Sequence, residues 1–349
     1  MRRSACWRGA AIQVVGLVTL PVFARVFSPA EYGVIEIANV TFAFVLVMAD
    51  AGFASASQRS YFDYGEDDAH KRRGVLLTAL LSSMLFAAVL GGLLFALRDP
   101  IADFLFAGQR YTSLIVLVAI AVPLSVLVNL SREAMRLRFR AWHYVISSAI
   151  TAVVAAGVGL LCVLVLHVGV ESLLIGILAG NLAATVYGLL VVRGDFAGRF
   201  SRYELRVMLA YGLPLVPTAI AAWALAFLDR LMLAQFSDLD EVGQYAIATR
   251  LGSVVLFAVI AFATAFAPFI LSLYAEDREQ ERQMRAKAYL TAITAFLSLS
   301  VVVALFAREG TAIIAPGFDD AHESVGLVCL GLTAFGASGL ALTLSLIHI

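Results

Sequence analysis

The chain has 349 residues and a formal net charge of zero, with 61% hydrophobic and only 14% charged residues. Soluble domains carry roughly 25% charged residues, so this composition excludes a soluble globular protein. It indicates an all-α protein that crosses a bilayer many times, because an apolar stretch of about 20 residues spans the hydrocarbon core as a helix.

About ten apolar segments of bilayer length follow one another along the chain, separated by short charged loops. The eighth segment is longer than a perpendicular span needs, so either Pro268 kinks it or its first turns project from the membrane. The predicted spans cover residues 9–27, 34–57, 75–97, 112–130, 144–167, 171–192, 207–228, 243–274, 288–307 and 324–347.

Basic residues gather in every second loop. If the N-terminus lies in the cytoplasm, most of the 25 Lys and Arg residues fall on the inside. The intervening loops lean acidic, as at residues 238–241 and 319–323. By the positive-inside rule, this pattern predicts a multi-pass protein of the inner-membrane type with a cytoplasmic N-terminus.

The loops leave little room for extramembrane chemistry. No predicted outer loop exceeds about 15 residues, and no phosphate-binding GxxxxGK[ST] motif occurs. Uphill movement would therefore depend on an ion gradient or on a sink at the far side. Cys6, Cys162 and Cys329 lack the spacing of a metal site, and we expect structural thiols.

An internal repeat relates residues 20–39 to residues 230–249. Both stretches end one predicted span, form an acidic turn and begin the next span with Gly. At an offset of 210 the identical pairs are Ala24/Ala234, Glu31/Glu241, Gly33/Gly243, Ile37/Ile247 and Ala38/Ala248.

Six spans separate the two copies, so both have the same polarity in the membrane. This relation indicates a parallel repeat, which in transporters means two lobes around a central cavity. We expect a six-helix N-terminal lobe over residues 1–205 and a C-terminal lobe of about four helices over residues 206–349.

Two stretches of sequence carry a family resemblance. LPVFARVFSPAEYG, followed by ADAGFASASQR, resembles the opening of the polysaccharide-biosynthesis flippases, the oligosaccharide-flippase (Wzx) type of the MOP superfamily. The stretch from Tyr211 to Gly252 resembles the start of the second lobe in the same family, with its Gly-x-Pro, Asp-Arg and Gly-x-Tyr elements.

The resemblance implies a transporter, not an enzyme. It would flip an undecaprenyl-diphosphate-linked oligosaccharide from the inner to the outer leaflet by alternating access, for lipopolysaccharide, O-antigen or another surface polysaccharide. The implied partners are this substrate, membrane lipids and other polysaccharide-assembly membrane proteins. Family members have twelve to fourteen spans, so we expect the second lobe to be incomplete in this chain.

Arginines within or beside the spans are the candidates to bind the diphosphate, since bidentate Arg–phosphate bonds are strong. Arg250 lies deep in a predicted span, whereas Arg25 and Arg230 lie near the predicted outer ends of theirs. The alternative for Arg25 is an interfacial arginine that extends to water.

Acidic and polar residues in the spans are candidates for ion coupling or gating. Glu36 and Asp50 lie on one helix face, about 21 Å apart, and Asn39 could share that face. Either carboxylate could bind a coupling H⁺ or Na⁺, although Asp50 could simply cap a helix. Asp229, next to Arg230, is a gating candidate.

Pro214 and Pro217 are hinge candidates, because proline breaks a helix and permits the bending that alternating access needs. No residues are assigned to catalysis or to a metal site.

Two other functions remain open. An ion-coupled multidrug or organic-cation exporter of the same superfamily would need carboxylates in its cavity, whereas deep arginines favour an anionic substrate. A membrane polysaccharide polymerase or ligase would need a larger outer loop than any in this chain.

Overall fold

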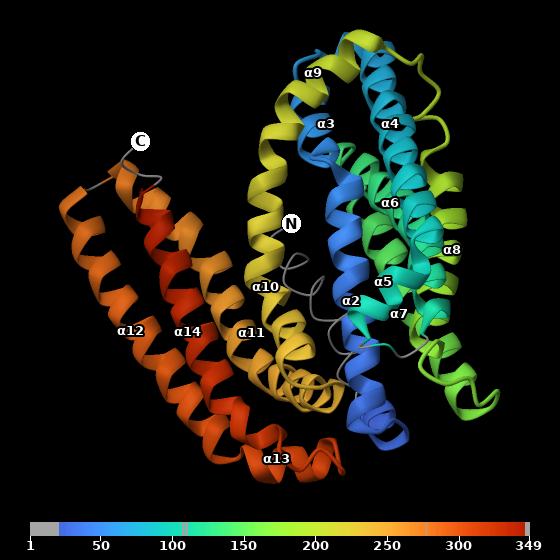
Figure 1. Ribbon diagram of the computed structural model, residues 1–349. Coiled ribbons are helices and arrows are strands. Elements are labelled where there is room, and N and C mark those ends of the chain that lie inside the picture. Colours follow the sequence, from blue (N-terminus) through green and yellow to red (C-terminus); the bar gives the residue numbers. More distant parts are fainter. Residues whose placement is uncertain (1–20, 107, 109–110, 277, 346–349) are drawn as a thin grey trace. The chain divides into compact units, whose positions relative to one another are not determined.

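The computed structural model describes residues 21–106, 108, 111–276 and 278–345, and all regular structure in these residues is helical (Figure 1). The elements in chain order are α2 (Pro29–Asp50), α3 (Phe53–Phe62), η1 (Glu66–Asp68), α4 (Ala69–Ala96), α5 (Arg98–Leu105), α6 (Thr112–Leu137), α7 (Ala141–Leu164), α8 (Ser172–Val192), α9 (Arg202–Gly212), η2 (Leu213–Leu215), α10 (Val216–Phe236), α11 (Leu239–Glu276), α12 (Arg278–Leu305), α13 (Ala307–Ile314) and α14 (Ala321–Ser345).

Eight stretches of the described residues are long and apolar enough to cross a membrane. They coincide with the second to ninth predicted spans, which confirms the prediction of an all-α, multi-pass bundle. The first predicted span lies largely outside the described residues, and the tenth coincides with α14. The eight stretches are Pro29–Phe62, Ala69–Ala96, Thr112–Leu137, Ala141–Leu164, Ser172–Val192, Arg202–Phe236, Leu239–Phe266 and Gln283–Leu305.

Helix α4 has one exposed apolar face and one face that packs against another helix. Leu81, Leu85, Val89 and Leu93 recur every four residues, and each is about half exposed or more, at 48–64%. Such a stripe faces lipid chains in a membrane protein. The opposite face holds small residues, and a Cβ on Gly91 would lie 2.8 Å from a carbonyl oxygen of α6.

Helices α7 and α8 pack closely because α8 carries small residues four apart. A Cβ on Gly176 would lie 2.4 Å from the Ala155 carbonyl oxygen, and one on Gly180 would lie 2.5 Å from the Thr151 carbonyl oxygen. This is the small-xxx-small packing common between membrane helices. The predicted burial of two thiols is confirmed, since Cys162 and Cys329 are buried and not disulfide-bonded.

The described residues form two compact units. Residues 30–239 form the first unit, and residues 21–29 together with 240–345 form the second. Helices α9 and α10 belong to the first unit, so this division differs from the predicted lobe boundary between residues 205 and 206. The assignment of the two lobes stays a prediction.

Candidate functional site

An ion pair joins α2 to α10 inside the first unit. Arg230 Nε lies 2.9 Å from Glu36 Oε1. Both residues are buried, with 9% and 6% of their surfaces exposed. Each stands in a candidate membrane span, where an isolated charge is costly, so the pairing allows both charges to be buried.

Neighbouring groups on α10 also contact Arg230. Its Nη1 donates a hydrogen bond of 2.7 Å to the Ala226 carbonyl and lies 3.4 Å from Asp229 Oδ1. The guanidinium carbon lies 5.4 Å from the centre of the Phe227 ring. The structure therefore brings together three predicted site residues, Glu36, Asp229 and Arg230.

An aromatic contact extends the seam between α2 and α10. Trp223 Nε1 donates a hydrogen bond of 3.3 Å to the Val40 carbonyl. The Trp223 and Phe44 rings lie 4.7 Å apart, centre to centre. Asn39 is partly buried on α2, and its predicted part in coupling or gating stays a prediction.

Asp50 lies at the end of α2, where the second predicted span breaks. Ala51 and Gly52 have positive φ angles of 44° and 75°, which end α2 before α3 begins. Asp50 Oδ1 accepts the backbone N–H of Ala54 at 3.3 Å, in the first turn of α3. Asp50 therefore links the end of α2 to the first turn of α3, and its ion-coupling role stays a prediction.

The break after α2 packs against a second break in the span formed by α9 and α10. A Cβ on Gly52 would lie 2.5 Å from the Gly212 carbonyl oxygen, and one on Gly212 would lie 2.9 Å from the Ala51 carbonyl oxygen. The 3₁₀ turn η2 holds Pro214, and α10 begins beside Pro217. Both hinge candidates therefore lie just after this backbone crossing.

Glu133 on α6 is a buried carboxylate that the sequence patterns did not single out, because it stands among arginines typical of a loop. It is 6% exposed and forms an ion pair with Arg136. The spacing of three residues between Glu133 and Arg136 could have indicated this residue, because it places an acidic and a basic side chain next to each other on a helix.

The other two predicted arginines belong to the second unit. Arg25 is exposed, and its Nη2 donates a hydrogen bond of 3.4 Å to the Ile313 carbonyl. Arg250 is exposed on α11, about 16 Å along the axis from Leu239. Fully buried residues surround it in sequence, namely Ala246, Ile247, Ala248 and Val255.

Comparison with known sequences places this chain near proteins of polysaccharide assembly. The polysaccharide biosynthesis protein family matches residues 22–315. Over 308 residues the chain is 25% identical to the succinoglycan biosynthesis transport protein ExoT of Rhizobium meliloti (strain 1021). The match covers 85% of this chain and 58% of ExoT, so the chain spans less than two thirds of that relative.

Solved structures share the fold. The lipid II flippase MurJ in an inward closed conformation has a TM-score of 0.76 at 16% identity, with 96% of this chain and 74% of MurJ covered. An inward-facing multidrug resistance MATE family transporter of the MOP superfamily has a TM-score of 0.68 at 14% identity, with 95% and 83% covered. These likenesses confirm the predicted MOP-type fold.

Proposed function

This chain belongs to the polysaccharide biosynthesis protein family, and we propose that it moves a lipid-linked oligosaccharide from the cytoplasmic to the outer leaflet of the bacterial inner membrane. The proposed substrate is an undecaprenyl-diphosphate-linked oligosaccharide, whose charged head must cross a medium of low dielectric constant. The relatives named above are a transport protein, a flippase and a transporter, and none is a polymerase or ligase.

The observation that carries the proposal is the exposure of Arg250 within a candidate span. An arginine at this depth is costly against lipid chains, and contact with water or an anionic group lowers that cost. A diphosphate supplies the anion, and the planar guanidinium matches it with two parallel hydrogen bonds. Arg25, exposed in the same unit, adds a second positive charge for the substrate head.

Glu36, Asp229 and Arg230 have a different proposed role. Because Arg230 already lies against a carboxylate at 2.9 Å, it is better suited to a gate than to a diphosphate contact. Breaking and remaking the pair would couple the two access states, and protonation of Glu36 or binding of Na⁺ there would drive the exchange.

The two broken spans supply the flexible points for alternating access. The crossing of Gly52 and Gly212, followed by Pro214 and Pro217, puts both breaks at one level of the first unit. Bending there, with the lipid tail left in the bilayer, would present the head group first to one side and then to the other.

A cation exporter is the second candidate, and one observation favours it. A buried carboxylate, Glu133, and a partly buried one, Asp50, lie in candidate spans of the first unit, and carboxylates inside a span suit a cationic substrate. Export of an organic-cation dye from cells would be lost on deletion of the gene if this candidate is correct.

Leaflet distribution tests the proposal. Deleting the gene should cause undecaprenyl-diphosphate oligosaccharide to accumulate in the cytoplasmic leaflet, and re-expression should reverse the accumulation. An unchanged distribution in a strain with no other flippase, together with lost dye export, would replace flipping with cation export.

A further inference from the structure

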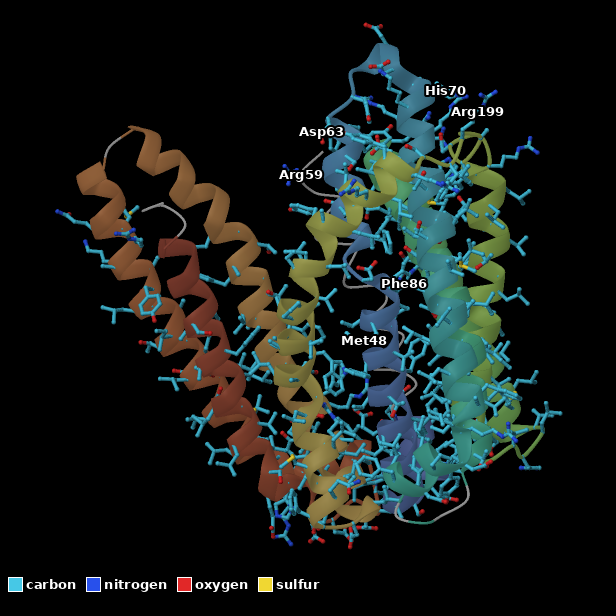
Figure 2. The ribbon with its side chains drawn as sticks, turned by 45° about the horizontal axis from the view of Figure 1, so that its top comes forward. Met48, Arg59, Asp63, His70, Phe86 and Arg199 are labelled. Atoms are coloured by element: carbon cyan, nitrogen blue, oxygen red, sulfur yellow. The ribbon has the colours of Figure 1, made fainter. Side chains whose placement is uncertain are left out.

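A cavity of about 330 Å³ lies in the first unit where α4 and α9 begin. We call it the boundary pocket, and its polar and aromatic lining includes Tyr64, His70, Lys71, Arg199, Tyr203 and Glu204. Figure 2 shows His70 and Arg199 close together at this end of the unit. None of these residues belongs to the proposed transport site.

The boundary pocket lies at the ends of membrane spans. Tyr64 stands between the candidate spans Pro29–Phe62 and Ala69–Ala96, and Arg199 stands just before Arg202–Phe236. Lipid headgroups occupy this level of a bilayer. The basic loops predict that this end faces the cytoplasm, where anionic lipids attract Lys and Arg.

Internal contacts hold the wall of the pocket in place. The Tyr64 hydroxyl donates a hydrogen bond to Glu204, which raises the pKa of Tyr64 to about 12. Arg72 donates two hydrogen bonds to the Tyr64 carbonyl, at 3.0 and 2.7 Å. The Ser201 backbone N–H donates to Thr78 Oγ1 at 3.0 Å. The wall is therefore formed before any ligand arrives.

The basic side chains of the pocket are available to an anion. Within the described residues, His70 and Arg199 make no side-chain hydrogen bond or ion pair. Lys71 pairs with Asp68 at 3.2 Å, but their side chains are 58% and 46% exposed, so the pair is weak. Glu204, the carboxylate in the lining, is already occupied by Tyr64.

Exposed aromatic residues lie beside these bases. Tyr203 and Phe200, both in the pocket lining, are 70% and 45% exposed. Aromatic rings of this kind sit at the headgroup level of membranes. A ligand that enters the pocket therefore meets cationic groups and an interfacial aromatic surface together, as a phospholipid headgroup would.

We propose that the boundary pocket binds the phosphate of an anionic phospholipid headgroup, with Arg199 and Lys71 as its main ligands and His70 as a third donor. Basic pockets between membrane helices bind anionic headgroups in this way. The bound lipid would link the start of α9 to the start of α4. This proposal is independent of the transported substrate.

Thermal unfolding of the full chain in neutral detergent tests the proposal. Phosphatidylglycerol, phosphatidylcholine and inorganic phosphate are titrated separately, and the shift in Tm is measured. We expect a saturable increase with phosphatidylglycerol alone. The double variant Lys71→Gln/Arg199→Gln should need at least about tenfold more phosphatidylglycerol for half the shift. Both side chains are exposed, so the variant should fold.

Arg206→Gln is the matched control, because Arg206 is exposed on α9 and does not line the pocket. It should keep the wild-type half-saturation point. An equal loss in the control and in the double variant would show diffuse attraction and overturn the proposal. So would a wild-type chain that does not respond to phosphatidylglycerol, or one that responds equally to inorganic phosphate.

Discussion

Arg230 and Arg250 look alike in the sequence, since each interrupts an apolar span. In the first unit, Arg230 is buried and lies 2.9 Å from Glu36. In the second unit, Arg250 is exposed although the residues around it in sequence are buried. Presence in a span therefore does not separate a buried arginine that joins two helices from an exposed one.

The difference has an energetic meaning. A buried pair neutralises its charge inside the protein, so removing one partner leaves the other charge unsatisfied. Arg250 is exposed, so its removal should cost less stability than the loss of one member of a buried pair. Substitution at Arg230 should therefore lower stability strongly, whereas substitution at Arg250 should impair transport with little change in stability.

The largest expected loss of stability follows Arg230→Ala. It leaves Glu36 buried and charged, which should cost at least about 3 kcal/mol of unfolding free energy. Thermal or denaturant unfolding in detergent measures this change. Little effect would mean that the pair with Arg230 is not what allows the Glu36 charge to be buried.

A charge exchange sharpens this test. Glu36→Arg combined with Arg230→Glu restores opposite charges across α2 and α10. It should recover much of the stability that Arg230→Ala loses, whereas either single reversal should be worse than Arg230→Ala. A double variant no better than the single reversals would argue against direct pairing.

Replacing one glycine in each unit compares how tightly the two units are packed around it. Gly52→Ala places a Cβ 2.5 Å from a backbone oxygen at a positive φ of 75°, and it should cost roughly 1–3 kcal/mol. Gly252→Ala meets the Val328 side chain at 2.7 Å, which can shift. We expect Gly252→Ala to lower the Tm less than Gly52→Ala does. Equal losses would contradict this difference in packing between the two glycines.

Removing a hydrogen bond from a neutral donor to a carboxylate should have an intermediate effect on stability. Tyr64→Phe removes the hydrogen bond to Glu204 and should cost about 1 kcal/mol. Because the pKa of Tyr64 is raised from 10 to about 12, its contribution is present below pH 10 and is lost as the pH rises through 12. The unfolding free energy of the wild type should therefore fall between pH 10 and 12 more than that of the variant does.

The smallest expected change in stability follows Arg250→Ala. Since Arg250 is exposed, its removal should alter the unfolding free energy by less than about 0.5 kcal/mol. Transport should nevertheless fall. A large destabilisation would show that Arg250 is structural, which would remove the contrast with Arg230.

Hydropathy and loop charge predicted the helical spans because each span must be apolar over bilayer length. They did not predict the break at Gly52, since the second predicted span continued to residue 57 and the break consists of two positive φ angles in the backbone. They also ended the fourth span at residue 130, whereas α6 continues to Leu137. Backbone hydrogen bonds extend a helix beyond its apolar part, and that extension makes Glu133 a helical, buried residue.

The sequence predicted which residues belong to the candidate site but not which of them contact each other. Glu36, Asp229 and Arg230 were candidates because charges in spans are costly. Their pairing depends on α2 and α10, which are remote in the sequence and come together only through the fold. For the same reason, helix periodicity placed Glu36 and Asp50 on one face but did not predict that their partners differ.

The most direct test of transport is the rate at which undecaprenyl-diphosphate-linked oligosaccharide crosses vesicles that contain the purified protein. Wild type, Arg250→Lys and Arg25→Ala/Arg250→Ala are compared after equal folding is confirmed by Tm. We predict translocation by the wild type, at least about a tenfold loss in the double variant and partial activity with lysine. A double variant that flips the lipid at the wild-type rate would contradict a role for these arginines in holding the diphosphate, and a wild type with no translocation would contradict the proposed function.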